Sequence, residues 1–225
     1  MTEVMRNALL VLACGAALAA VAGVWMFAAN EPSPSPPKPA TRRKRSVEEV
    51  LAARRSVREF TDAALGEQEI AQLCWAAQGI TDPKQGFRTA PSAGATYPLE
   101  LYVVTADRVR RHVPDKHELV EHLKGDVRRR LRQAALDQRW VESAPAVFVI
   151  AADVQRTARR YGQRAERYVL IEVGHAAQNL LLQAEALGLG GVSVGAFEDD
   201  RVGEVLWLPQ GQRPLYLLPV GKPGT

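Results

Sequence analysis

The 225-residue chain has few of the residues that build metal centres and disulfide frameworks. It contains two cysteines, Cys14 and Cys74, and four histidines, none with the spacing of a metal site. Because the two cysteines lie in unrelated sequence contexts, neither a disulfide framework nor a zinc site is predicted. We therefore expect no metal at the functional site.

Glycine fingerprints for nucleotides are also missing. The sequence has no Rossmann or P-loop motif, and its expected helices and strands mix without the regular alternation that builds a parallel sheet. This pattern favours an α+β fold.

Most of the chain lacks an excess of positive charge. The formal net charge is +4, but residues 1–46 carry six Lys and Arg against two acids, whereas residues 47–225 carry 23 of each sign. A nucleic-acid-binding domain needs a basic surface of its own, so none is predicted. The length suits one domain with a proper core and an appendage.

The appendage begins with an apolar run. Residues 8–29 contain no charged side chain, and a helix of this length spans roughly the 30 Å hydrocarbon core of a bilayer. Trp25 and Phe27 suit an interfacial position near its end. We predict an uncleaved transmembrane helix that makes residues 1–30 an N-terminal membrane anchor.

Three alternatives to this anchor are weaker. A cleaved signal peptide would use the small residues 20–22, but the apolar run continues past them. Residues 11–14 resemble a lipoprotein cleavage box, yet the apolar stretch before Cys14 is short. A buried core helix is the third alternative, and the length of the run argues against it.

A proline-rich basic linker follows at residues 31–46. Its prolines favour an extended spacer, and the basic residues 42–45 suit contact with anionic head groups. Since Arg6 alone precedes the span and five Lys and Arg follow it, the positive-inside rule predicts a single-pass protein of the inner (cytoplasmic) membrane, with its domain facing the cytoplasm.

The domain, residues 47–225, opens with a capping-box pattern at residues 46–49, which predicts a short helix. It leads into Arg54-Arg-Ser-Val-Arg-Glu-Phe60. Because guanidinium groups and a serine hydroxyl can converge on one phosphate, Arg54, Ser56 and Arg58 are candidate phosphate ligands. The alternative is a solvated basic helix end.

A second helix is predicted at residues 67–78, with Cys74 on its apolar face as a small core residue. Residues 81–90 are polar and turn-rich. In the loop at residues 91–98, small side chains would let a planar ligand approach the backbone. An ordinary surface loop is equally consistent with it.

The remaining elements follow from periodicity. The expected strands are residues 101–105, 145–152 (buried and central), 189–197 (leaving a glycine pair) and 214–220, and the expected helices are 113–139 (mainly helical and charged), 164–187 and 199–206.

The helix predicted at 164–187 is apolar nearly all round, which indicates burial on more than one side, in a domain centre or a dimer. Gly174 in its middle suggests close helix packing. We interpret His175 and Asn179 as hydrogen-bonded packing residues.

In this order the motifs resemble the nitroreductase superfamily. They are Arg54–Phe60, Pro-Ser-Ala-Gly-Ala-Thr-Tyr-Pro at 91–98, Gly-His-Ala-Ala-Gln-Asn at 174–179, Ala-Leu-Gly-Leu-Gly at 186–190, Val-Gly-Ala-Phe at 194–197 and Leu-Pro-Val-Gly at 218–221. The loop with Ser-Ala-Gly-x-x-Tyr-Pro is most similar to the SagB-type dehydrogenase branch.

The resemblance implies a mixed sheet flanked by helices and a homodimer with FMN at the subunit interface. It places the FMN phosphate on Arg54, Ser56 and Arg58, with Lys222 as a further charge. The flavin ring and ribityl chain would lie against the proline-serine loop and the Gly195 region; the loop residues are Pro91, Ser92 and Ala93.

The implied function is an FMN-dependent oxidoreductase working in ping-pong fashion. NADH or NADPH would be the reductant and a small organic acceptor the oxidant, or a small or peptide substrate would be dehydrogenated. No catalytic residue is assigned. Many nitroreductases have an asparagine where this chain has Ala95, and no adjacent lysine-tyrosine pair of azoline-oxidising members is present. A non-catalytic, membrane-tethered flavin-binding scaffold and an enzyme that consumes its flavin are the alternatives.

Overall fold

The computed structural model describes residues 36–42 and 44–224. The predicted anchor at residues 1–30 lies outside this range, as does the first part of the linker. No helix in the described part of the chain combines the length and apolar character needed to cross a membrane. The anchor and its orientation stay predictions.

A six-stranded sheet organises the domain, and each pair of neighbouring strands in it is antiparallel. In spatial order the strands are β5 (Glu118–Lys124), β4 (Arg108–Val113), β3 (Leu99–Val104), β6 (Ala146–Asp153), β8 (Gln212–Gly221) and β7 (Gly190–Gly191). The predicted strands at 101–105, 145–152 and 214–220 are confirmed, and β6 is buried along nearly its whole length.

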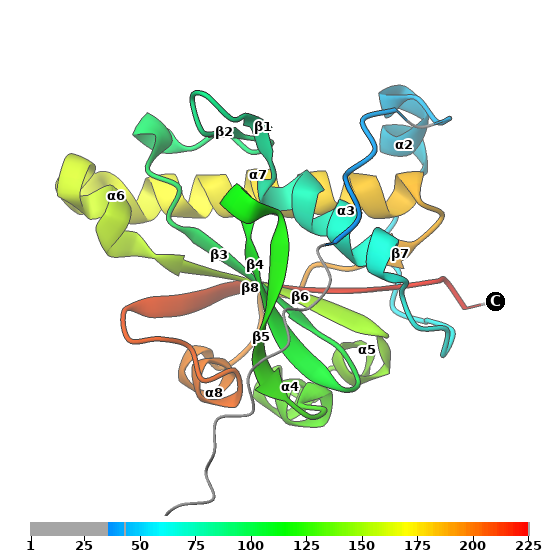
Figure 1. Cartoon of the computed structure of the whole chain (residues 1–225). Helices are drawn as coiled ribbons and strands as arrows, with labels where there is room; N and C mark the ends of the chain where they lie inside the picture. Colours follow the sequence, from blue (N-terminus) through cyan, green and yellow to red (C-terminus); the bar gives the residue numbers. More distant parts are fainter. Residues whose placement is uncertain (1–35, 43, 225) are drawn as a thin grey trace, which may run out of the picture. The chain divides into compact units, whose positions relative to one another are not determined.

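Helices cover both faces of the sheet (Figure 1). On one face lie α3 (Glu67–Gln78) and α7 (Ala165–Ala186), and on the other lie α4 (Arg128–Ala134), α5 (Arg139–Ser143) and α8 (Asp199–Val205). Phe148 and Ile150 of β6 belong to the first core and Val147 and Val149 to the second. This alternation follows from the two-residue period of a strand, and it confirms the α+β fold with flanking helices.

The helix expected over residues 113–139 is wrong in its first half. Residues 108–124 form the β4–β5 hairpin, joined by a turn in which His117 has a φ of 48°. The charged composition suggested a solvated helix, but two arginines of β4 pair with carboxylates of other elements. Arg110 lies 2.7 Å from Glu67, and Arg111 lies 3.3 Å from Glu100. Such long-range pairs are invisible to local sequence patterns.

The strand expected at residues 189–197 is also shorter than predicted. The glycine pair itself forms β7. Beyond it the chain follows β8 through the Val192 N–H, which donates to the Pro219 carbonyl at 3.1 Å, and through the Val194–Leu217 bridge. The parallel component of the predicted mixed sheet is limited, among the described residues, to the Ser56–Gly191 bridge.

The short helix α2 (Val47–Ala53) has the predicted capping box. The Glu49 N–H donates to the Ser46 hydroxyl at 3.2 Å, and the Ser46 N–H donates to the Glu49 carboxylate at 2.6 Å. Of its predicted apolar face only Val50 is buried, because Val47 and Leu51 are more than half exposed.

The end of the linker lies against the domain. Ala40 exchanges two hydrogen bonds with the Gln72 side chain, at 2.8 and 3.0 Å, and Arg45 forms an ion pair with Glu185 at 2.7 Å. These contacts place residues 40–45 beside α3 and α7.

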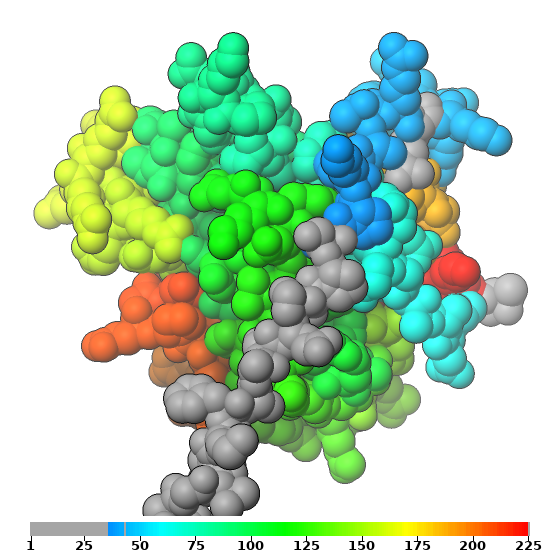
Figure 2. Space-filling view, in the orientation of Figure 1, coloured from blue at the N-terminus to red at the C-terminus, as the bar shows by residue number. Residues whose placement is uncertain are grey.

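The remaining elements are the hairpin of β1 (Ile80–Asp82) and β2 (Phe87–Arg88), the helix α6 (Val154–Tyr161) and three 3-10 turns, η1 (Ala93–Ala95), η2 (Pro114–Lys116) and η3 (Gly162–Arg164). Figure 2 shows α2 and the β1–β2 hairpin projecting on either side of an indentation, with α3 between them. A cavity of about 280 Å³ lies among α2, α3 and α7.

Candidate functional site

The basic stretch after α2 runs along the edge of the sheet. Arg54 caps α2 with φ −51° and ψ 123°, which is not helical, so the chain leaves the helix there. Ser56 then pairs in parallel with Gly191, whose carbonyl accepts from the Val57 N–H at 3.0 Å. The alternative of a solvated basic helix end is therefore wrong, because this stretch is an extended segment bound to β7.

The residues that follow this segment pair with the end of β8. The Thr61 N–H donates to the Lys222 carbonyl at 2.9 Å, and Phe60 pairs with Pro223. The structure therefore brings Lys222 to the edge that carries residues 54–58.

Three cations at this edge form no ion pair with any residue that the structure describes. Across residues 36–42 and 44–224, none of Arg54, Arg58 and Lys222 forms an ion pair. The Arg58 guanidinium lies over the Trp140 ring, 5.3 Å from its centroid. Arg55 instead donates to the carbonyls of Ala52 and Arg54 at 3.0 and 2.9 Å. Unpaired cations beside exposed backbone suit an anionic group such as phosphate.

Gly195 lies farther along the same edge. Its neighbour Val194 exchanges backbone hydrogen bonds with Leu217 of β8 at 2.8 and 3.0 Å. Gly195 is exposed, and a Cβ there would lie 3.6 Å from the Tyr216 ring. Its backbone is therefore open to a ligand that extends from the basic segment along β8.

The proline-serine loop lies elsewhere in the same chain. The Thr96 hydroxyl bonds to that of Thr157 at 2.9 Å, and Arg160 donates to the Gly94 carbonyl at 3.2 Å, so the loop is held against α6. Figure 1 shows α6 and β7 near opposite ends of α7. One chain thus does not bring Pro91, Ser92 and Ala93 together with the basic segment.

The backbone of this loop is unusual. Gly94, Ala95 and Tyr97 all have positive φ values, of 58°, 53° and 44°. Asparagine tolerates this region better than alanine does, so Ala95 adopts a conformation that suits the asparagine that many nitroreductases have in this loop. The Ser92 hydroxyl stabilises the turn by accepting from the Tyr97 N–H at 2.9 Å.

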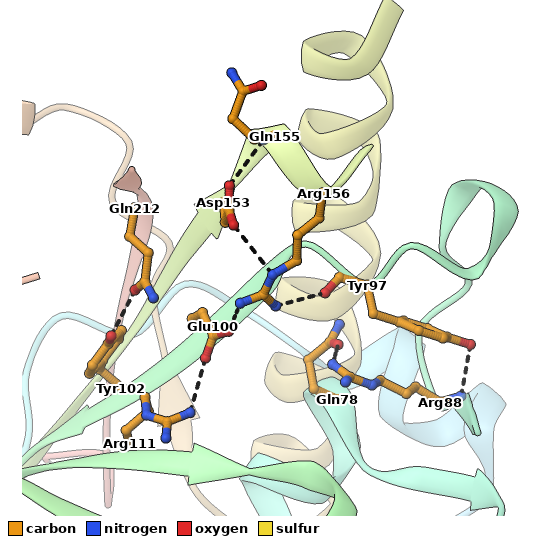
Figure 3. A network of polar contacts seen from close by, with 10 residues as sticks. All are labelled: Gln78, Arg88, Tyr97, Glu100, Tyr102, Arg111, Asp153, Gln155, Arg156 and Gln212. Carbon is orange, nitrogen blue, oxygen red and sulfur yellow. Dashed lines mark hydrogen bonds and ion pairs between the residues drawn. The ribbon is translucent and has the colours of Figure 1, made fainter. Parts of the chain in front are cut away.

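A buried polar group lies behind the loop. Glu172 of α7 is 2% exposed, and burial raises the pKa of its carboxyl to about 7, against smaller lowering effects from a hydrogen bond with Ser92 and from the Arg88 charge. Arg88 donates to the Gln78 side chain at 2.9 Å and stacks 4.5 Å from the Tyr97 ring centroid (Figure 3). Burial also lowers the pKa of Arg88.

A second network fixes the loop from the sheet side. Glu100 of β3 pairs with Arg111 and Arg156, and Arg156 also donates to the Tyr97 carbonyl at 3.3 Å (Figure 3). Glu172, Arg88 and this network are not among the residues predicted from the sequence. One signal was present, since Glu172 interrupts an apolar stripe with a carboxylate next to Val173.

The structure also tests the packing roles that were predicted for single residues of α3 and α7. Cys74 is 1% exposed and burial raises the pKa of its thiol, which confirms a core residue. Asn179 donates to the Thr89 carbonyl at 3.2 Å, as expected for a packing residue. His175 and Gly174 are exposed, and nothing within the described chain lies within 4 Å of a Cβ at Gly174. The packing expected at these two positions is therefore absent within the described chain.

These features define an α+β protein with helices on both faces of an antiparallel sheet and a basic segment bound to one sheet edge. The sequence profile of the nitroreductase family matches residues 51–222. A protein of Methanocaldococcus jannaschii, named as a nitroreductase, is 47% identical over 182 residues, which cover 78% of this chain and 90% of that protein. The chain belongs to the nitroreductase family.

More distant relatives are similar over the same domain. The FMN reductase (NADPH) of Bacillus subtilis is 29% identical over 191 residues, which are 79% of this chain and 66% of that enzyme. A solved nitroreductase-type structure from Ralstonia eutropha matches with a TM-score of 0.77 and 26% identity, covering 85% of this chain and 89% of that one. This chain thus spans about two thirds of the B. subtilis enzyme and most of the R. eutropha protein.

Proposed function

We propose that this protein is an FMN-dependent oxidoreductase that takes hydride from NADH or NADPH and reduces a small organic acceptor in ping-pong fashion. The observation that carries the proposal is the placement of Arg54, Arg58 and Lys222 along one glycine-lined edge, where none of them forms an ion pair among the described residues. The B. subtilis relative, an FMN reductase that uses NADPH, supports both the flavin and the reductant.

The residues at this edge fit the FMN phosphate. Two guanidinium groups and an ammonium offset its charge, and the exposed Ser56 hydroxyl adds a donor. Val57 packs closely on Gly190, which holds the segment against β7. A rigid set of donors binds an anion with a smaller loss of entropy than a flexible one.

When bound, FMN would supply the reversible acceptance and donation of a hydride. The protein's part is to hold and orient the cofactor. The bare backbone at Gly195 permits close approach to the ring edge, and the loop at residues 91–93 would cover a ring face and exclude water.

The working unit in this proposal is a homodimer with FMN at the interface. Two observations support it: the basic segment and the proline-serine loop lie apart in one chain, and α7 has an exposed stripe. Leu170 and Ile171 are 50% and 48% exposed, one helical turn before Gly174. A second copy of α7 could pack across this stripe and bring the loop of the partner subunit to the basic segment.

The sequence Ser92-Ala-Gly-x-x-Tyr97-Pro favours a SagB-type dehydrogenase as the finer assignment. In that case the same site would dehydrogenate a small or peptide substrate. The Tyr97 ring is fixed by Arg88 and the Tyr97 carbonyl by Arg156, so the loop offers a rigid surface for such a substrate.

The decisive experiment is an anaerobic reduction of the purified full-length protein. We expect a yellow protein that releases FMN on denaturation and whose flavin absorbance is bleached by NADPH or NADH. A colourless protein that recovers no FMN on reconstitution would exclude the proposal. A yellow protein that neither nucleotide bleaches would favour the flavin-binding scaffold.

We further propose that residues 8–29 anchor the protein in the inner membrane with the domain facing the cytoplasm. The charge-free run and the basic residues that follow it support this orientation. Deleting residues 1–30 should move the protein to the soluble fraction while FMN binding persists. Reporter fusions after Thr225 test the orientation. Activity of a reporter that works only in the periplasm would show that the predicted orientation is wrong.

A further inference from the structure

A buried carboxyl with an unused acceptor lies next to the candidate site. Glu172 points inward from α7, and its Oε1 is buried without a hydrogen-bond partner among the described residues. An unpaired buried carboxylate is costly, because the interior solvates a charge poorly. Such a group is stable in its protonated form.

The immediate surroundings of Glu172 are polar. The charged group that faces it is Arg88 of β2, and the Ser92 side chain is a polar neighbour close enough to lower the pKa of its carboxyl. Arg88 Nε and Gln78 Nε2 are likewise buried without partners among the residues described. Two unused donors and one unused acceptor thus lie in one interior region, linked by the bond from Arg88 to Gln78 at 2.9 Å.

Ser92 connects this interior group with the surface of the loop. Its side chain is half-buried, between the buried Glu172 and the exposed Pro91. The Ser92 oxygen accepts from the Tyr97 N–H at 2.9 Å and has a second lone pair free. A protonated Glu172 can therefore donate to Ser92 while the serine proton turns toward the loop surface.

We propose that Glu172 is a proton reservoir that supplies the substrate through the Ser92 hydroxyl. The inference rests on the proposed function, in which Ser92 lies against the cofactor. It makes Glu172 a positioning residue that acts through Ser92.

The stoichiometry of the reaction requires such a proton. NADPH gives one hydrogen and both electrons as a hydride, so an acceptor that gains two hydrogens needs one proton more. The Glu172 O–H bond breaks and its proton passes to the Ser92 oxygen, while the serine proton passes to the reduced acceptor. A proton taken up from the solvent as hydronium then restores the Glu172 carboxyl, and no further oxidant or reductant is consumed.

The pKa of Glu172 supports this role. Burial raises it to about 7, so the carboxyl is partly protonated near neutrality, where a proton donor works best. Donation should be available below this pKa and should be lost as the pH rises through it.

The test compares three single variants of the full-length protein with the wild type. They are Glu172→Gln, Ser92→Ala and, as the matched control, Glu166→Gln. Glu166 lies on the same helix but is exposed and pairs with Arg213. FMN content and anaerobic bleaching by NADPH are measured first, and reoxidation by p-benzoquinone is then followed from about pH 5 to about pH 9.

In the wild-type protein and in Glu166→Gln, the rate of reoxidation should fall as the pH rises through about 7. In Glu172→Gln and Ser92→Ala it should be about 100-fold lower at acidic pH and nearly independent of pH. A wild-type pH profile in Glu172→Gln would overturn the inference. Absence of flavin in the wild-type protein would instead reject the proposed function on which this inference rests.

A second measurement needs no flavin turnover. Infrared spectra of the full-length protein should contain a protonated carboxyl band that titrates near pH 7 and is missing from Glu172→Gln. If Glu172 is already ionised at pH 5, it cannot be the proton donor, and this result would refute the proposal even if Glu172→Gln and Ser92→Ala lose activity.

Discussion

Val57 lies directly against Gly190, where a Cβ would come within 2.6 Å of the valine Cγ2. The contact joins the basic segment to β7, and the neighbouring Val57 N–H bonds to the Gly191 carbonyl at 3.0 Å. The position of the candidate phosphate ligands therefore depends on a glycine far away in sequence.

Replacing Gly190 with alanine should destabilise the protein by about 1–3 kcal/mol, because the new methyl group must displace Val57. FMN affinity should fall as well, since Ser56 and Arg58 would move with the segment. Thermal unfolding and FMN titration measure the two effects.

The matched control for this change is Gly203→Ala. Gly203 lies in α8, and a Cβ at this position would have no neighbour within 4 Å among the described residues. Alanine in a helix is also about 1 kcal/mol more favourable than glycine. This variant should be at least as stable as the wild type. Equal losses in both variants would show that the Val57 contact is unimportant.

Arg58→Ala should weaken FMN binding by about 10- to 100-fold, as expected for the loss of a charge-assisted hydrogen bond. Arg55→Ala is the control, because the Arg55 side chain donates to backbone carbonyls at the end of α2. Equilibrium dialysis of FMN against both variants provides the comparison. Full retention of FMN by Arg58→Ala would count against the predicted phosphate site.

Ile171→Glu should convert the proposed homodimer to monomers that retain little FMN, since a charge would be buried in the interface. Trp207→Glu is a suitable control, because Trp207 is 71% exposed and follows α8 rather than lying on α7. Sedimentation velocity measures the oligomeric state of the two variants, and the flavin content measures their bound FMN. A dimeric, yellow Ile171→Glu protein would refute the α7 interface.

Stability should depend on pH through Glu172. Its pKa rises from 4.5 in the unfolded chain to about 7 in the folded one, so the folded state binds more protons between these values. The stabilisation is complete below about pH 4.5 and is lost as the pH rises through 7. The loss amounts to at most about 3.5 kcal/mol, at about 1.4 kcal/mol for each unit by which the pKa is raised.

The measurement is the difference in unfolding free energy between wild type and Glu172→Gln across this range. The difference is needed because His112 acts in the opposite sense: burial lowers its pKa to about 3, so its contribution falls as the pH decreases. A difference that does not change with pH would contradict the shifted pKa of Glu172.

Three elements were predicted correctly because the residues within or next to each of them carry the signal. The capping box of α2, the apolar run of β6 and the length of α7 each follow from neighbouring residues. The β4–β5 hairpin escaped prediction because Arg110 and Arg111 are neutralised by Glu67 and Glu100, which lie on other elements.

The same division holds for the candidate site. The sequence by itself determined the family motifs, the neutral charge of the domain and the types of side chain that suit a phosphate. Only the tertiary structure decided that Lys222 joins the basic segment, that the proline-serine loop lies apart from it, and that Glu172 is buried behind Ser92. The physical reason is that side-chain chemistry is encoded residue by residue, whereas burial and charge pairing arise from contacts between distant parts of the chain.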